Sequence, residues 1–199
     1  MSRQIESVAV LGCGTMGSGI AAASAAAGCR VLMLDMTSEA VERGLQAVDE
    51  DDRHLVSTGT FDDDLALIAD YDWICEAIVE DVVIKQQLFA KVEPLRKDGS
   101  VISSNTSGIP LREIAAGMPE RFQADVAITH FFNPVRVMKL FELVPGRQTT
   151  PDVIEAYAAF GENQLGKGVV HAKDTVNFIG NLIGCYFMLS GLHLAKPFL

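Results

Sequence analysis

The sequence predicts an α/β fold with a doubly wound, mostly parallel sheet that is covered by helices on both faces. Short runs rich in Val, Ile and Leu, which are typical of buried strands, alternate with longer helical patterns through most of the chain. Such alternation favours parallel strands, because a helix is the usual connection between them. No internal repeat or low-complexity linker interrupts the pattern.

The predicted elements follow in order from these patterns. Strands are expected at residues 8–11, 30–34, 55–56, 73–75, 101–103, 126–129, 139–144 and 169–170. Helices are expected at residues 18–27, 38–48, 62–68 and 82–96, and again from residue 110 and from residue 151. Gly28 is the expected C′ residue of the first helix, Ser38 can cap the second, and Pro110 and Pro151 suit first turns. The acidic run at residues 49–52 is expected to be solvated surface.

The composition excludes several classes of protein. Of the 199 residues, 49% are hydrophobic and 21% are charged, which is typical of a globular protein. The length allows one core and the start of a second unit. A net charge of −10 without a basic cluster argues against a nucleic-acid partner. Residues 178–195 come nearest to a membrane span, but Asn181 and His193 interrupt them, so a buried or amphipathic helix and no membrane insertion are predicted.

The cysteines and the first residues indicate a cytoplasmic protein. The N-terminal residues enter the first predicted strand almost at once, so no secretory signal is expected. Four cysteines are scattered without the spacing of a metal site: Cys13, Cys29, Cys75 and Cys185. We therefore expect reduced thiols and no metal centre.

A glycine-rich loop after the first strand predicts a dinucleotide site. The strand runs into Gly-x-Gly-x-x-Gly and then into a helix of small residues, the order found in Rossmann-type folds. Gly12 permits the tight turn, Gly14 lets a pyrophosphate approach the backbone, and Gly17 lets the helix lie close to the strand. The helix N-terminus offers free N–H groups to the phosphates. The loop residues expected to bind the cofactor are Gly12, Gly14, Thr15, Met16 and Gly17.

Asp35 predicts which dinucleotide binds there. It ends the second predicted strand, eighteen residues after Gly17. An acidic side chain at this point binds the ribose hydroxyls of NAD and repels the additional phosphate of NADP. NAD is therefore the expected cofactor.

His130 and Glu142 form a candidate catalytic pair. Oxidising an alcohol with NAD requires a base, and a histidine pKa of about 6.5 suits that role. His130 alone among the four histidines combines a strand end with a rigid sequence after it, Phe-Phe-Asn-Pro. Glu142 lies in an apolar segment, where a carboxylate needs a partner such as an imidazole. A structural role for His130 stays open on these observations alone.

Three polar features follow predicted strands. Glu80, the loop at residues 104–107 and His130 each come just after an apolar run. Ligands of parallel sheets bind outside the carboxyl ends of the strands, so these features are expected to lie on one rim of the sheet.

Several linked motifs resemble those of the L-3-hydroxyacyl-CoA dehydrogenases. The resemblance covers residues 7–184 and extends to the order of the motifs. It is carried by Glu76-Ala77-Ile78-Val79-Glu80, Ser104-Asn105-Thr106-Ser107, His130-Phe131-Phe132-Asn133-Pro134, residues 139–144 and Lys173-Asp174-Thr175. The segments at residues 105–111 and 165–170 look more like a branch of long bacterial fatty-acid-oxidation proteins, in which an enoyl-CoA hydratase-like domain follows the dehydrogenase.

The resemblance implies a role for each matching residue. His130 would be the general base and Glu142 its orienting carboxylate, while Ser107 and Asn181 would hydrogen-bond the reacting oxygen of an acyl-CoA substrate. On the cofactor side, Asn133 would hold the nicotinamide end, with Ser107, Glu80 and Lys85 near the ribose or carboxamide. Simpler roles stay open for three of these residues: a helix cap for Ser107, a solvated lysine for Lys85 and a turn residue for Asn133.

The chain departs from the family pattern in three ways. Val176 and Asn177 stand where the family usually has Pro and Gly, and Leu182 stands where it has Arg, which puts the Asn181 role in doubt. The segment between the second strand and residue 61 is too short for the helical arm that helps many relatives hold coenzyme A. The chain ends within what resembles the first helix of an all-helical second domain.

Residues 1–184 are thus expected to form the NAD-binding domain and residues 185–199 the beginning of an incomplete helical domain. The expected reaction is the NAD-dependent oxidation of (3S)-3-hydroxyacyl-CoA to 3-oxoacyl-CoA in fatty-acid β-oxidation. The chain would be a fragment of a longer protein or a homo-oligomer. The alternatives are an NAD-binding module that is inactive without a C-terminal domain, and another NAD-linked hydroxyacid dehydrogenase.

Overall fold

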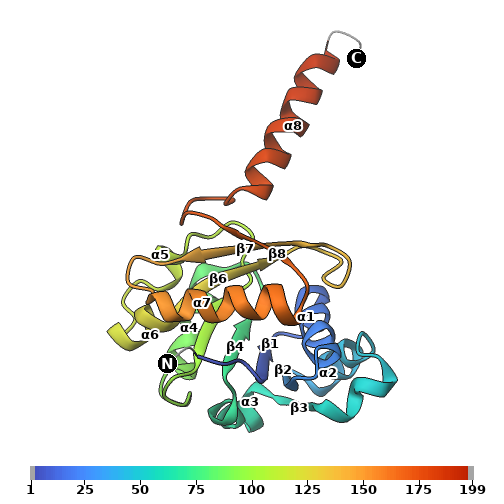
Figure 1. Ribbon diagram of the computed structural model, residues 1–199, viewed down its shortest axis with the longest axis vertical. Coiled ribbons are helices and arrows are strands. Elements are labelled where there is room, and N and C mark those ends of the chain that lie inside the picture. The colour runs from blue at the N-terminus through green and yellow to red at the C-terminus, as the bar shows by residue number, and fades with distance from the viewer. Residues whose placement is uncertain (1–2, 197–199) are drawn as a thin grey trace.

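The computed structural model describes residues 3–196 and confirms the predicted α/β architecture. Its sheet has eight strands in the order β3-β2-β1-β4-β5-β6-β7-β8 (Figure 1). Neighbouring strands are parallel except for β6 and β7, which are antiparallel. The order reverses at β1, so that β2 and β4 lie on either side of it. This is the arrangement of Rossmann-type sheets.

The bounds of the elements agree with most of the predicted segments. The strands are β1 Ser7–Leu11, β2 Arg30–Asp35, β3 Val56–Thr60, β4 Trp73–Glu76, β5 Val101–Ser104, β6 Val126–Phe131, β7 Leu140–Pro145 and β8 Gly168–His171. The helices are α1 Thr15–Ala26, α2 Ser38–Leu45, α3 Phe61–Asp64, α4 Val82–Val92, α5 Leu111–Ile114, α6 Glu120–Asp125, α7 Pro151–Ala159 and α8 Gly180–Ala195. Short helical turns of other types lie at η1 Glu50–Leu55, η2 Leu65–Asp70 and η3 Phe160–Gln164.

The sheet is buried on both faces by helices. On one face, α1 and α7 pack over it and contribute Ile20 and Tyr157 to the core. On the other face, α4, α5 and α6 contribute Phe89, Ile114 and Phe122. Every residue of β1 is buried, and burial of one large aliphatic side chain stabilises a fold by about 1.5–3 kcal/mol. These two cores fix the positions of the strand ends.

Some local predictions were wrong, and one helix was missed. The cap of α2 is Thr37 and not Ser38, because the hydroxyl of Thr37 accepts a hydrogen bond from Ala40 N at 3.2 Å. The helix expected at residues 82–96 ends at Val92, after which the chain turns and buries Arg96. Helix α6 was not predicted, because its six residues are too few to show a clear helical period.

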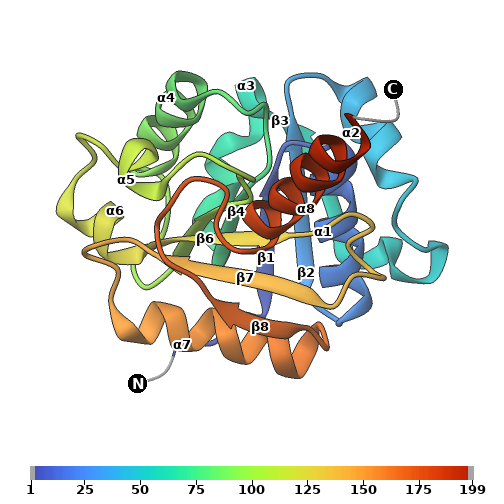
Figure 2. The same ribbon diagram turned by 90° about the horizontal axis from the view of Figure 1, so that it is seen from above.

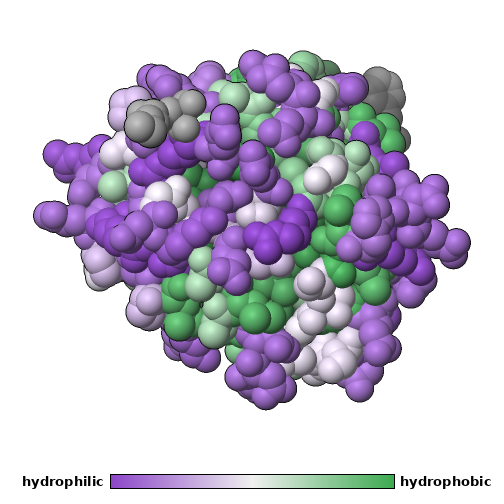
Figure 3. Space-filling model, turned by 60° about the horizontal axis from the view of Figure 1, so that its bottom comes forward, coloured by the Kyte–Doolittle hydropathy of each residue, from purple (hydrophilic) through white to green (hydrophobic). Residues whose placement is uncertain are grey.

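Helix α8 was predicted to be buried or amphipathic, and this was wrong. It rises away from the carboxyl ends of the strands (Figures 1 and 2), and none of its residues is buried. Large apolar side chains stand exposed along it, with Tyr186 and Phe187 each 69% exposed. Hydrophilic side chains cover most of the opposite end of the molecule, with smaller hydrophobic areas between them (Figure 3). No helix within residues 3–196 is long and apolar enough to cross a lipid bilayer.

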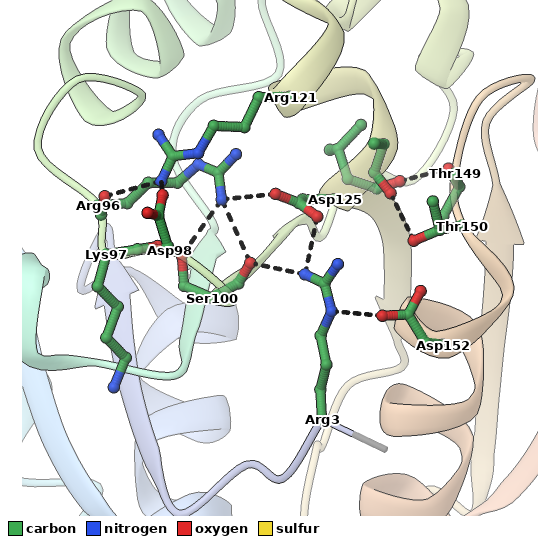
Figure 4. Close-up of polar contacts among 12 residues, drawn as sticks. Arg3, Arg96, Lys97, Asp98, Ser100, Arg121, Asp125, Thr149, Thr150 and Asp152 are labelled. Atoms are coloured by element: carbon green, nitrogen blue, oxygen red, sulfur yellow. Dashed lines mark hydrogen bonds and ion pairs between the residues drawn. The ribbon is translucent and has the colours of Figure 1, made fainter. Parts of the chain in front are cut away.

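The amino-terminal edge of the sheet carries a network of arginines and carboxylates (Figure 4). The fully buried guanidinium of Arg96 contacts Asp125 at 2.8 Å and Glu93 at 2.6 Å. Asp125 also contacts Arg3 at 2.7 Å, and Arg3 contacts Asp152 at 2.7 Å. The network therefore joins the segment before β1 to the segments before β5 and β6 and to the first turn of α7.

Candidate active site

The glycine loop between β1 and α1 has the geometry that a phosphate cradle needs. Gly12 has φ +105°, and a Cβ atom there would lie 2.7 Å from the carbonyl oxygen of Ala77. A Cβ atom on Gly17 would lie 1.8 Å from the carbonyl oxygen of Gly12, so α1 packs directly on the loop. No atom lies within 4 Å of a Cβ placed on Gly14, which leaves that side of the loop open. Thr15 and Met16 form the first turn of α1 beside this opening.

Asp35 lies against the same loop. Its carboxylate accepts hydrogen bonds from Cys13 N and Met36 N, each at 2.6 Å. A cleft of about 600 Å³ lies here, lined by Gly12, Gly14, Asp35 and the apolar side chains of Phe61, Leu65, Ile84 and Leu88. Its walls suit the adenosine half of a dinucleotide, with the carboxylate placed to bind ribose hydroxyls.

Cys13 occupies this loop without offering a nucleophile. Burial and the charge of Asp35 raise the pKa of the thiol to about 12, so it stays protonated. All four cysteines are unpaired. Within residues 3–196, no three His, Cys, Asp or Glu side chains are grouped to hold a metal ion.

The structure brings His130 and Glu142 together across antiparallel strands. The two residues are directly opposite each other in the β6–β7 ladder, and Nδ1 of His130 lies 2.7 Å from Oε2 of Glu142. The side chains are only 3% and 0% exposed. Because an ionised carboxylate can only accept, Nδ1 carries the proton of the neutral imidazole and Nε2 is left as the acceptor. Nε2 makes no hydrogen bond to any described residue.

Glu142 is also fixed by the chain that leads into α8. Its other oxygen, Oε1, accepts hydrogen bonds from Ile179 N at 3.0 Å and Gly180 N at 2.7 Å. A carboxylate at a helix N-terminus is favourable, because unpaired N–H groups point toward it. The aromatic rings of Phe132 and Phe178 lie 4.4 Å and 5.6 Å from that of His130.

Ser107 and Asn181 lie next to each other. The Asn181 amide donates a hydrogen bond to the Ser107 carbonyl oxygen at 3.0 Å. Ser107 does not cap the following helix, because the first N–H groups of α5, on Leu111 and Arg112, bind Asp174 at 2.6 Å and 3.0 Å. The Ser107 hydroxyl makes no hydrogen bond within the described part of the chain.

Glu80 holds the Ser107 loop. One of its oxygens accepts hydrogen bonds from the Thr106 hydroxyl at 2.5 Å, from Ser107 N at 2.9 Å and from Gly108 N at 3.3 Å. Partial burial alone would raise the pKa of Glu80, but the hydrogen bond from Thr106 and the charge of Lys85 outweigh it and hold that pKa below the usual value. Glu80 is therefore an ionised anchor for the loop.

Lys85 is not the solvated helix lysine that the sequence left open. Its ammonium is 1% exposed and lies 2.6 Å from Glu76 and 3.4 Å from Glu80. Glu76 also accepts a hydrogen bond from the Ser104 hydroxyl at 2.5 Å. Burial raises the pKa of Glu76, and the nearby Lys85 charge opposes that shift. Lys85 thus pairs with two carboxylates, Glu76 at the end of β4 and Glu80 in the segment between β4 and α4.

Sequence reasoning missed Glu76 and Asn105 as members of the site. Glu76 ends β4 and Asn105 directly follows β5, and both side chains are buried. The Asn105 amide oxygen accepts a hydrogen bond from Phe131 N at 3.0 Å, which ties the Ser107 loop to the end of β6. For Glu76 the detectable signal was a carboxylate directly after a run of buried apolar residues, whereas Asn105 follows two serines and has no such signal. Asn133 is exposed and makes no side-chain hydrogen bond to the described residues, so no contact supports the turn role left open for it.

Comparison with known families agrees with this geometry. Residues 7–175 match the family model described as "3-hydroxyacyl-CoA dehydrogenase, NAD binding domain". The chain belongs to the 3-hydroxyacyl-CoA dehydrogenase family. It is an NAD-binding domain, and the open glycine loop with Asp35 beside it fits that cofactor.

Individual members of the 3-hydroxyacyl-CoA dehydrogenase family are similar over most of this chain. A "Probable 3-hydroxyacyl-CoA dehydrogenase" from Bacillus subtilis is 42% identical over 95% of the chain, which covers 28% of that protein. One of the same name from Deinococcus radiodurans is 40% identical over 97% of the chain and 61% of that protein. A "Putative fatty acid oxidation complex trifunctional enzyme" from Rickettsia felis is 36% identical over 94% of the chain and 28% of that protein. The chain therefore spans only part of these longer relatives.

A solved structure from the same family has the same fold. The crystal structure of FadB2 from M. tuberculosis superposes with a TM-score of 0.88 at 31% identity, covering 98% of this chain and 73% of that one. The (S)-3-hydroxybutyryl-CoA dehydrogenase PaaH1 from Ralstonia eutropha superposes with a TM-score of 0.82 at 30% identity, covering 92% of this chain and 68% of that one. The doubly wound fold of the 3-hydroxyacyl-CoA dehydrogenases is thus present here.

Proposed function

We propose that this chain supplies the NAD-binding and acid–base part of a 3-hydroxyacyl-CoA dehydrogenase. The reaction is the interconversion of a (3S)-3-hydroxyacyl-CoA plus NAD⁺ with a 3-oxoacyl-CoA plus NADH and a proton. The observation that carries the proposal is the buried His130–Glu142 pair, whose 2.7 Å contact leaves Nε2 as the acceptor. Its place at the carboxyl edge of the sheet, beside the Ser107 loop, supports a role in chemistry.

The proton has a defined path in this arrangement. NAD, when bound, supplies the nicotinamide ring that takes or gives the hydride. His130 Nε2 accepts the proton of the substrate hydroxyl in the oxidation, and returns it to the carbonyl oxygen in the reduction. Glu142 holds Nδ1–H and stabilises the imidazolium that forms. Because both side chains are buried, little competing water screens this charge pair.

Ser107 and Asn181 are the residues that would position the reacting oxygen. The contact between the Asn181 amide and the Ser107 carbonyl oxygen supports a shared site. Glu80 and Lys85 stabilise that loop on the cofactor side, and Asn133 follows His130 closely enough to meet the nicotinamide end. Together these residues form the rim expected around the substrate carbonyl.

Helix α8 is the proposed start of a second, helical domain, with the boundary near residue 184. The exposed apolar side chains of Leu182, Tyr186 and Leu189 support packing against further helices of a longer chain or against another copy. The thioester substrate would bind between that unit and the carboxyl edge of the sheet. We also propose that the protein acts in the cytoplasm, which four unpaired cysteines support.

The test is oxidation of NADH in the presence of acetoacetyl-CoA, followed by absorbance. We expect His130→Gln to lower kcat by about 10²-fold or more, because the acid–base group is lost. His54→Gln is the matched control, since His54 is exposed and lies in η1. Near-normal turnover by His130→Gln would contradict the mechanism. NADH binding without turnover, even after a homologous helical domain is supplied, would favour a non-catalytic NAD-binding module.

A further inference from the structure

Lys167 is a buried lysine for which the reaction above has no role. It lies just before β8 and is 7% exposed. Its ammonium donates hydrogen bonds to the carbonyl oxygens of Val135 and, at 2.8 Å, Met138. No carboxylate among the described residues pairs with it. Burial and the charge of Lys139 lower the pKa of Lys167. Removing this cation from water costs free energy, and only the two carbonyl groups offset that cost.

These two carbonyls belong to one turn of the chain. Val137 N and Met138 N donate to the Pro134 carbonyl oxygen at 3.0 Å and 2.9 Å, so residues 134–138 form a single helical turn. The carbonyls at the end of such a turn have no partner within it, and a cation is favourable there. Lys167 supplies that cation from a distant segment.

The two segments are joined in both directions. The Lys139 ammonium donates to the Gly166 carbonyl oxygen at 3.1 Å. Gly168 N donates to the Lys139 carbonyl oxygen at 2.8 Å. The turn at residues 134–138 and the segment at residues 166–168 therefore hold each other in place, and Lys167 makes the buried part of this contact.

The same turn packs against the helix that follows the glycine loop. Val135 is 3% exposed, and a Cβ atom placed on Gly19 of α1 would lie 2.9 Å from its Cγ2 atom. The turn is thus confined between α1 on one side and Lys167 on the other. Asn133 comes directly before it and lies three residues after His130.

We propose that Lys167 is a positioning residue for the nicotinamide half of the cofactor, acting through the turn at residues 134–138. The inference rests on the proposed function, because hydride transfer requires the nicotinamide to lie near His130 and hence near Asn133. The adenosine half belongs to the Asp35 cleft, which Gly12 and Gly14 line and to which no residue of the turn at residues 134–138 contributes. Loss of the Lys167 contacts therefore weakens binding of one half of NADH and leaves the other half unchanged.

The experiment measures dissociation constants of NADH and of ADP-ribose, which lacks the nicotinamide, by calorimetric titration of the full 199-residue chain. Lys167→Met is expected to raise the Kd for NADH by about tenfold, the effect of losing one or two charge-assisted hydrogen bonds. The Kd for ADP-ribose is expected to change by less than about twofold. Lys167→Arg restores most of the NADH affinity, because a guanidinium also donates to carbonyls. Lys97→Met is the matched control, since Lys97 forms an exposed ion pair at the opposite edge.

Each of the other possible results of these titrations would contradict one specific claim. An unchanged Kd for NADH in Lys167→Met would remove the positioning role. Equal losses for NADH and ADP-ribose would show that Lys167 only stabilises the fold, and would also remove that role. If Lys167→Met does not fold, Lys167→Arg is compared with Lys167→Gln by the same two titrations. If the ratio of the Kd for NADH to the Kd for ADP-ribose is the same in both variants, the inference is overturned. Failure of the unmodified chain to bind NADH would contradict the proposed function itself.

Discussion

The amino-terminal and carboxyl-terminal edges of the sheet carry two networks of charged side chains that differ in how their polar atoms are used. At the amino-terminal edge, the buried Arg96 side chain contacts Glu93 and Asp125. Arg3 contacts Asp125 and Asp152 at the same edge (Figure 4). At the carboxyl-terminal edge, two polar groups stay without a partner among the described residues: His130 Nε2 and the Ser107 hydroxyl.

The difference separates a stabilising network from a reactive one. Arginines and carboxylates that satisfy one another hold the segments before β1, β5 and β6 and the first turn of α7 together, and they offer little to a ligand. At the other edge, the carboxylates of Glu142 and Glu80 fix His130 and the Ser107 loop, whose remaining polar atoms have no partner among the described residues. Unused hydrogen-bonding capacity on groups held in fixed positions is what a preorganised site requires.

Arg96→Leu gives the largest expected effect and should act on stability alone. Removing one partner from a buried ion network leaves uncompensated charge, so the free energy of unfolding should fall by about 3–5 kcal/mol. Urea denaturation followed by circular dichroism measures this change. The Kd for NADH of the folded fraction should not change. A loss below about 1 kcal/mol would contradict the stabilising role of this edge.

Glu142→Gln should produce the next largest effect, which is a loss of turnover. A neutral amide cannot stabilise the imidazolium on His130, so kcat for acetoacetyl-CoA reduction should fall by about 10²-fold, or about 2.7 kcal/mol in activation free energy. The Kd for NADH serves as the control and should stay within about twofold. Turnover close to that of the unmodified chain would remove Glu142 from the mechanism.

Asp35→Ala should change selectivity more than either stability or rate. Without its carboxylate the ribose hydroxyls lose a partner and the phosphate of NADPH is no longer repelled. We expect the ratio of Kd values for NADPH and NADH to fall by about tenfold, or about 1.4 kcal/mol. Fluorescence titration with both cofactors measures this ratio. If it does not change, Asp35 does not select the cofactor.

Arg136→Ala should have the smallest effect. Its guanidinium contacts Asp49 at 2.9 Å, but the two side chains are 49% and 55% exposed. Exposed pairs contribute about 0–1 kcal/mol, so the free energy of unfolding should change by about 0.5 kcal/mol or less. Urea denaturation of the Arg136→Ala and Arg96→Leu variants under the same conditions provides the comparison. A larger loss would mean that ion pairs stabilise this chain irrespective of burial.

The sequence was most informative where local chemistry decides the structure. Gly12, Gly14 and Gly17 sit in a tight loop whose geometry follows from the absence of side chains, and Asp35 ends the next strand. The opposition of His130 and Glu142 was foreseeable as a partnership, because a carboxylate in an apolar strand needs one. The antiparallel register that brings the two side chains into contact could not be predicted from the sequence.

Features that depend on distant segments were not predictable from local patterns. Glu76 is paired with Lys85 on α4, and Asn105 accepts a hydrogen bond from Phe131 on β6. The sequence around Glu76 and Asn105 does not indicate these partners. Asn177 and Phe178 adopt positive φ values of 63° and 45°, at and just after the position where the family usually has Gly. Such backbone costs about 1–3 kcal/mol per residue and persists only where tertiary contacts impose it.

The two oxygens of Glu142 connect the beginning of helix α8 to the His130 imidazole. One oxygen holds His130, while the other holds the backbone at Ile179 and Gly180 where the helix begins. A swing of α8 about residues 177–180 would pull on the same carboxylate that keeps the ring aligned. A second unit that packs against α8 would therefore act on the same carboxylate that orients the base.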